Sequence, residues 1–254
     1  MKEKFIAGIY NYCDRWCERC TFTTRCRNYE STSELSSEQL DVSNKIFWNA
    51  ISSNFQKAIT VLHKTAKEHG IDLDKVMTEE EQVKWQEKRS FLNDSAKQHL
   101  LSRLCKQYQA IVMPFAEKSE DFADKTRELA DHLHLGIKSP EEVVHTVAGI
   151  GDCFDIIQWY VHFMDAKLQR ALRGKMEGEE WEIENGYQRD SDGSAKIAMM
   201  AVERSIGAWI RLYELMPASE DVALQALSLL SQLKQKSEEE FPKAMQFKRP
   251  GFDE

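Results

Sequence analysis

The sequence contains few residues that interrupt helices. Among its 254 residues there are only 11 glycines and 5 prolines. Because glycine and proline mark turns and breaks, their scarcity favours long helices over a fold of strands and turns. The chain also lacks an apolar run near the ~18–20 residues that a membrane span requires. It has no glycine-rich phosphate loop, no Gly-x-Ser-x-Gly and no His-Glu-x-x-His motif, so the motif-defined enzyme classes gain no support.

The charge balance is acidic. There are 42 acidic and 34 basic side chains, which gives a formal net charge of −8. Binding along a nucleic-acid backbone requires an excess of lysine and arginine, so we expect no nucleic-acid partner. The apolar fraction of 42% is too high for a disordered chain, and the length suits one large domain or two small ones.

The N-terminal residues do not have the pattern of a secretory signal. Their apolar stretch, about six residues between Phe5 and Tyr10, is shorter than the ~7–15 residues of a signal-peptide core, and Glu3 lies in the charged lead. We therefore expect a cytoplasmic protein with no membrane association. Disulfides are rare in that compartment, so the 6 cysteines are expected to be thiols or metal ligands.

Apolar residues recur every three or four positions along most of the chain, which is the helical period. The first long stripe is formed by Phe47, Ile51, Phe55, Ala58 and Leu62. No alternating strand pattern and no repeat of fixed period occurs, so the sequence predicts an all-α fold, a multi-helix bundle. The expected helices span residues 42–69, 79–113, 120–135, 140–174, 195–215 and 220–240.

Breaks between the helices are also predicted. Pro114 is expected to end the second long helix, and residues 175–193 to form a polar loop. Ser139 and Glu142 match the capping box that opens a helix. The tail from residue 248 to 254 is expected to be irregular. We divide the chain into a cysteine-rich metal-binding segment, residues 1–29, and a helical bundle domain, residues 30–254, packed as one compact unit.

Four of the cysteines form a dense cluster with the spacing C-x3-C-x2-C-x5-C, at Cys13, Cys17, Cys20 and Cys26. On an α-helix the first three would share one face, but Cys13 and Cys20 would lie ~10 Å apart along its axis. A single Zn²⁺, with Zn–S bonds of ~2.3 Å, needs its sulfurs much closer, so zinc requires the helix to break within the motif. An iron–sulfur cluster of the 4Fe-4S type accommodates more widely spread thiolates. Both metals stay open.

Other interpretations of the cluster also stay open. The thiols can be unliganded core cysteines, since free cysteine packs well. Cys17 and Cys20 can form a redox-active pair, although no thioredoxin-like strand pattern accompanies them. The C-x3-C-x2-C spacing is also that of radical-SAM enzymes, but those enzymes use a β/α barrel for which this chain has no strands. Cys105 and Cys153 lie on helical apolar stripes, and we assign them to the core.

Polar residues within an apolar helix suggest a second candidate site. Asp155 and His162 fall near one stripe of the 140–174 helix, and Glu203 lies in the 195–215 helix. Together they could line a buried catalytic or metal pocket. The structural alternative is that the polar groups of the 140–174 helix pair with Arg204 or Arg211 across the bundle. A single Glu142-x-x-His145 pattern is too little for a di-iron bundle, which needs two such motifs.

Three stretches carry a resemblance: YNYCDRWCERCTFTTRC at residues 10–26, GSAKIAMMAVERSIGAW at residues 193–209 and FKRPGFDE at residues 247–254. On these residues the chain resembles an uncharacterised family of bacterial proteins. The resemblance implies a single full-length unit and carries no activity.

We therefore expect a metal-binding helical protein that holds an iron–sulfur cluster or zinc. Redox or metal sensing, or electron transfer with a protein or redox partner, would be its role. Two alternatives are an enzyme with a buried Asp155, His162 and Glu203 site, and a helical interaction module in which zinc is purely structural.

Overall fold

The computed structural model describes residues 4–33, 35–73, 78–117, 119–178 and 180–253. These ranges are predominantly helical and contain no strand, which confirms the all-α prediction. The chain divides into two compact units: unit 1 is Met1–Asn11 with Arg15–Phe91, and unit 2 is Tyr12–Asp14 with Leu92–Glu254. This division differs from the expected boundary after residue 29. No helix within the described ranges is long and apolar enough to cross a membrane.

Unit 1 begins with three short 3-10 turns and then becomes α-helical. Its described elements are η1 (Ile9–Asn11), η2 (Cys17–Arg19), η3 (Thr23–Arg25), α1 (Arg27–Ser33), α2 (Ser37–Leu40), α3 (Lys45–Glu68) and the part of α4 (Glu79–Gln98) up to Phe91. Helix α3 begins where the Asn44 side chain accepts a hydrogen bond from the backbone N–H of Ile46. It ends before Gly70, whose φ of 69° lies in the left-handed region that glycine tolerates. The predicted helix over residues 42–69 is confirmed.

The apolar stripe of α3 is largely exposed, although Phe47 and Ile51 near its start are half-buried. Phe55 is 67% exposed and Leu62 is 56% exposed, and among the residues of α3 only Ala66 is buried. The sequence pattern correctly indicated an amphipathic helix.

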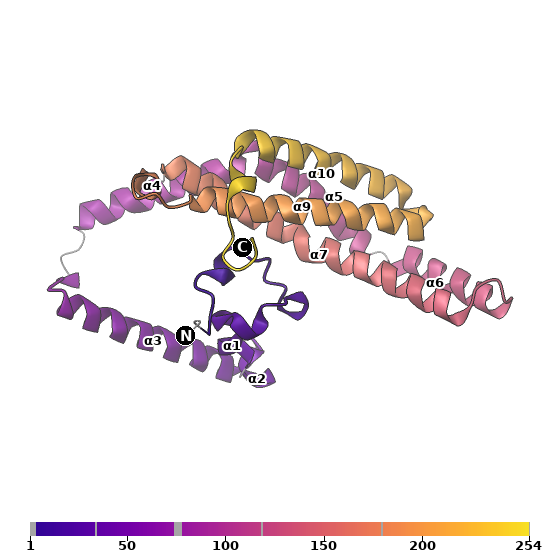
Figure 1. Cartoon of the computed structure of the whole chain (residues 1–254), viewed down its shortest axis with the longest axis horizontal. Helices are drawn as coiled ribbons and strands as arrows, with labels where there is room; N and C mark the ends of the chain where they lie inside the picture. The colour runs from indigo at the N-terminus through magenta and orange to yellow at the C-terminus, as the bar shows by residue number, and fades with distance from the viewer. Residues whose placement is uncertain (1–3, 34, 74–77, 118, 179, 254) are drawn as a thin grey trace. The chain divides into compact units, whose positions relative to one another are not determined.

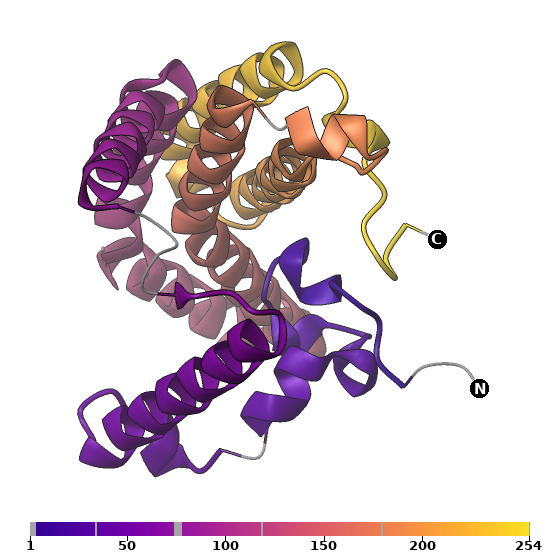
Figure 2. The ribbon, with the colours of Figure 1, turned by 90° about the vertical axis from the view of Figure 1, so that its left-hand side faces the viewer.

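Unit 2 is built around four long helices: α5 (Leu100–Glu117), α7 (Pro140–Glu177), α9 (Asp190–Leu215) and α10 (Glu220–Glu240). Each packs against two of the others in the cyclic order α5, α7, α9, α10, and they run alongside one another in both views (Figures 1 and 2). Their shared core is completely buried at Met164, Leu168, Leu212 and Leu230. Cys105 and Cys153 are buried as predicted, and burial raises the pKa of both thiols.

Helix α6 (Ser119–His134) forms a hairpin with the first part of α7. Gly136 ends α6 with a φ of 67°. The predicted capping box then opens α7: the Ser139 N–H donates to Glu142 Oε2 at 2.8 Å, and the Glu142 N–H donates to Ser139 Oγ at 3.2 Å. Local sequence signals thus place both ends of this turn.

Two helix boundaries differ from the prediction. Pro114 lies inside α5, which continues to Glu117, and the break falls earlier, between α4 (Glu79–Gln98) and α5. At that break the His99 ring accepts a hydrogen bond from the Leu101 N–H, and Ser102 Oγ donates to the Ala96 carbonyl. Side chains that bond to nearby backbone groups compete with the helical ladder, which explains the interruption.

The predicted loop over residues 175–193 is partly helical. It contains the end of α7, the short α8 (Glu180–Glu184) and the first turn of α9, which begins at Asp190 rather than Ala195. The polar start of α9 is buried, with Asp192 only 7% and Lys196 only 8% exposed. Buried charges must be paired. Asp192 accepts a hydrogen bond from the Arg189 guanidinium at 2.9 Å within the same turn, whereas Lys196 has its partners outside α9.

Candidate functional site

The cysteine segment is not a continuous α-helix. Three separate 3-10 turns replace it, and Arg15 has a φ of 61°, a left-handed conformation that a non-glycine residue seldom adopts. Immediately after it, the Cys17 N–H donates to the Arg15 carbonyl at 3.0 Å, which closes a tight turn around Trp16. The Arg19 guanidinium lies 3.9 Å from the centre of the Trp16 ring. The chain therefore bends within the motif.

Cys17 and Cys20 belong to one such turn. The Cys20 N–H donates to the Cys17 carbonyl at 3.1 Å, the hydrogen bond of a single 3-10 turn. Cys17 opens this turn and Cys20 follows it as the C-cap, in an extended conformation with φ −89° and ψ 128°. The backbone N–H of Phe22 points at the Cys20 Sγ, 3.4 Å away. An N–H directed at a sulfur stabilises negative charge on it, the role that outer hydrogen bonds have at metal-bound cysteines.

Cys26 ends the third turn of the segment. Its N–H donates to the Thr23 carbonyl at 3.2 Å, and its own carbonyl accepts from Glu30 at the start of α1. Cys17, Cys20 and Cys26 are all partly exposed and none is in a disulfide. In the part of the chain that the structure describes, no three His, Cys, Asp or Glu side chains gather as a metal-ligand group.

Cys13, the first cysteine of the pattern, belongs to unit 2. Its neighbour Tyr12 donates from its hydroxyl to Asp190 Oδ1 at 2.8 Å. Asp190 also accepts two hydrogen bonds from Arg170, at 2.9 and 2.7 Å. A Cβ built on Gly193 would lie 2.5 Å from the Tyr12 ring, so only glycine lets the ring approach α9 this closely.

Asp14 is bound on the other side of Cys13. Its carboxylate accepts hydrogen bonds from Arg204 and, at 2.8 Å, from the Tyr160 hydroxyl. The indole N–H of Trp159 donates to the Asp14 carbonyl at 3.0 Å. Burial raises the pKa of Tyr160 to about 12, so its hydroxyl stays protonated and can donate to the carboxylate. Residues 12–14 are thus attached to α7 and α9 by side-chain and backbone hydrogen bonds.

A cavity of about 80 Å³ lies beside this attachment. Cys13, Tyr160, Arg204 and Arg249 line it, with Met200 and Phe252 among the apolar residues. The Arg204 and Arg249 guanidinium groups are each bonded to a carboxylate, of Asp14 and Asp253 respectively. The cavity therefore lies between two ion pairs of the same unit.

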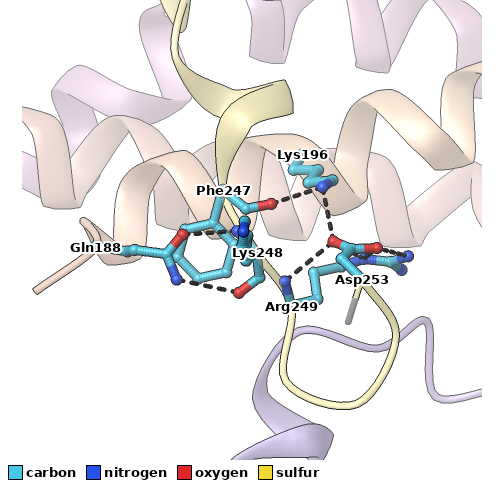
Figure 3. A network of polar contacts seen from close by, with 6 residues as sticks. All are labelled: Gln188, Lys196, Phe247, Lys248, Arg249 and Asp253. Carbon is cyan, nitrogen blue, oxygen red and sulfur yellow. Dashed lines mark hydrogen bonds and ion pairs between the residues drawn. The ribbon is translucent and has the colours of Figure 1, made fainter.

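The C-terminal tail is held by the network shown in Figure 3. Lys196, near the start of α9, donates to the Phe247 carbonyl at 2.6 Å and to Asp253 Oδ2 at 2.7 Å. The Asp253 carboxylate also accepts from the Arg249 guanidinium, and these bonds hold the pKa of Asp253 well below its usual range. The Gln188 side chain bonds both the N–H and the carbonyl of Lys248.

This network supplies the partners of the buried Lys196, and it was not predicted from the sequence. The tail is irregular in secondary structure, as predicted, but it is fixed in place. Two signals were present: Lys196 stands within an otherwise apolar and small run, and Arg249 and Asp253 are four residues apart with opposite charges. Neither signal specifies a partner that lies 51 or 57 residues away in the sequence.

The second candidate site is not buried. Asp155, His162 and Glu203 are all exposed, and Glu203 forms an ion pair with Lys234 at 3.0 Å. The expectation that they line a buried pocket is therefore wrong about their burial, because Ile157, Val161 and Met164 turn the other side of α7 toward the core. The bonds observed for Arg204 are to Asp14 and Tyr160. No protein-family model, no curated protein and no solved structure matches the chain.

Proposed function

We propose that this chain is a helical metal-binding protein whose cysteine segment binds Zn²⁺ or an iron–sulfur cluster. The carrying observation is the Cys17–Cys20 turn, which brings two cysteines of the pattern into one hydrogen-bonded turn and directs the Phe22 N–H at the Cys20 sulfur. Cys26 follows in the same unit. Cys13 is included because of its spacing in the sequence.

The broken backbone favours zinc over a cluster. A continuous α-helix would spread the thiols too far for one ion, and the 3-10 turns with the bend at Arg15 remove that obstacle. Four-cysteine zinc sites are usually structural, and their binding energy contributes directly to folding. Zinc would then act as a cross-link within a segment that buries few side chains. A cluster would instead imply redox sensing or electron transfer.

The test is elemental analysis of protein purified without oxygen, together with its absorption spectrum and acid-labile sulfide. One equivalent of zinc in colourless protein is expected. A brown protein with labile sulfide would identify the cluster and contradict the zinc preference. Metal-free protein in which all four segment thiols react with a thiol reagent would contradict both.

Matched variants locate the ligands. Cys17→Ser and Cys20→Ser should each remove most of the metal, because each takes away one thiolate. Cys153→Ala is the control, since this thiol is buried in α7 of unit 2 and should leave the metal content unchanged. Metal retained in both serine variants, or lost in the control, would place the metal elsewhere.

A further inference from the structure

The apolar face of α3 is the largest feature that the cysteine site does not explain. Bulky side chains are exposed from near its start to near its end, with Trp48 at 57%, Phe55 at 67%, Ile59 at 51% and Leu62 at 56%. Ile51 is half-buried. Isolated exposed apolar residues are common on protein surfaces, but a continuous row marks an interaction surface. The question is what covers it.

The spacing of the row is that of a helix-pairing seam. In the seven-residue repeat of paired helices, the first and fourth positions face the partner helix. Along the chain these positions are separated alternately by three and by four residues. These positions are Trp48, Ile51, Phe55, Ala58, Leu62 and Thr65. The 24 residues of α3 make it about 36 Å long, so the seam extends over most of the helix. Such a face fits another helix.

The positions of the charged residues on α3 indicate which kind of partner helix its apolar face can bind. Between the ends of the seam, the two positions that flank it carry Ser52, Asn54, Ile59 and Val61, all uncharged. The flanks carry a charge only at the two ends of the helix, at Lys45 and Glu68. An acidic partner would require cations at these flanks, and so would a surface of anionic lipid. The lysines between the ends of the seam lie instead on the outward positions of the repeat, Lys57 and Lys64. An uncharged face with outward lysines is complementary to a copy of itself, because no like charges meet.

The sizes of the seam residues specify the direction. In a parallel pair each residue meets its own copy, so that two Trp48 rings meet at one end and two Thr65 side chains at the other. In an antiparallel pair large residues face small ones, which fills the space evenly. The antiparallel layers are Trp48 with Thr65, Ile51 with Leu62, and Phe55 with Ala58.

From these observations we infer that α3 pairs with α3 of a second copy of this chain, antiparallel, and forms a two-fold symmetric dimer. The interface is isologous, since each helix offers the same face to the other. It is small in comparison with obligate interfaces, so the dimer should dissociate on dilution within the micromolar range.

Sedimentation equilibrium of the full chain over a range of concentrations tests the pairing. The purified protein should show a monomer–dimer equilibrium. Phe55→Lys should raise the dissociation constant by about 100-fold or more, because each dimer would bury two ammonium groups. Leu224→Lys is the matched control: Leu224 is 58% exposed, on α10 of unit 2, and its replacement should leave the equilibrium unchanged.

Three results would overturn the inference. One is a chain that stays monomeric at the highest concentration. Another is a dimer that survives Phe55→Lys. The third is a monomeric chain that binds vesicles of anionic phospholipid and loses that binding in Phe55→Lys, which would assign the face to a lipid surface instead.

The direction has its own test. In the antiparallel pair residue 52 of one copy faces residue 59 of the other, whereas in a parallel pair these residues lie apart. Mixing Ser52→Glu protein with Ile59→Lys protein should therefore enrich the mixed dimer above the random proportion. A random distribution of the three dimers would contradict the antiparallel arrangement.

Discussion

The two units of the chain use similar helices in different ways. In the described part of the chain, the buried apolar residues of unit 1 are Ile9 and Ala66, whereas unit 2 buries a continuous core along α5, α7, α9 and α10. Helix α3 is as clearly amphipathic as α5, yet its apolar face is exposed. Apolar periodicity therefore reports that a face exists, and says nothing about what covers it.

This difference in buried apolar surface indicates where each unit obtains its stability. Unit 2 needs no metal ion or disulfide to fold, because burial of apolar surface along four helices supplies the driving force for folding. Unit 1 buries too little for that, and segments with small cores are normally stabilised by metal ions, disulfides or association. The α3 pairing proposed above lies in unit 1, as do three of the four cysteines of the proposed metal site, so both are candidates for such a source.

The largest expected effect comes from the core of unit 2. Trp209 is fully buried, packs 5.4 Å from the Phe115 ring and donates to the Tyr108 hydroxyl at 2.9 Å. Trp209→Ala should lower the free energy of unfolding by about 3–5 kcal/mol, because it leaves a cavity. Urea denaturation followed by circular dichroism measures the loss. A change below about 1 kcal/mol would mean that this core does not stabilise the unit.

The attachment of the tail should give the next largest effect. Lys196→Met removes two charge-assisted hydrogen bonds, to Phe247 and Asp253, and should cost about 1.5–3 kcal/mol. It should also make the C-terminal residues open to limited proteolysis. Lys236→Met is the control, because Lys236 forms only an exposed pair on α10 and its loss should be nearly neutral. Equal losses in the two variants would remove any special role for the tail.

Two glycines of α9 give a matched pair. A Cβ on Gly193 would lie 2.5 Å from the Tyr12 ring and 2.7 Å from the Phe247 ring, whereas a Cβ on Gly207 meets nothing within 4 Å. Gly193→Ala should therefore destabilise the chain by about 1–3 kcal/mol through crowding. Gly207→Ala should stabilise it by up to about 1 kcal/mol, because alanine favours the helix. Thermal melts of both variants compare them, and a stabilising Gly193→Ala would refute the close approach.

Acid should weaken the tail attachment. The folded pKa of Asp253 is depressed by Arg249 and Lys196, so the carboxylate contributes stability that is complete well above its unfolded pKa of about 3.9. That contribution is lost as the pH falls below this value toward the folded pKa. Asp253→Asn should thus be less stable than the parent chain at neutral pH, and the difference should shrink in acid. A difference that stays constant down to strongly acidic pH would exclude the linkage.

These comparisons also show which features of the sequence are predictive. The helices and their caps were predicted well, because periodicity and the Ser139–Glu142 box act within a few residues. The four cysteines were identified as candidates from their spacing. Their backbone was harder to foresee, since the bend depends on a left-handed Arg15. The partners of Lys196 and the exposure of His162 depend on contacts between distant elements, which a local pattern cannot specify.

The smallest change in the free energy of unfolding is expected for a substitution on α3, and it compares the two units most directly. Phe115, 4% exposed on α5, and Phe55, 67% exposed on α3, are the same residue type on apolar helix stripes. Phe115→Ala should cost about 3–5 kcal/mol, because the ring is buried against Phe154 and Trp209. Phe55→Ala should change the free energy of unfolding by less than about 0.5 kcal/mol when the chain is dilute enough to be monomeric. If Phe55→Ala costs as much as Phe115→Ala under those conditions, the α3 face is covered within its own chain, and both the contrast between the units and the proposed pairing fail together.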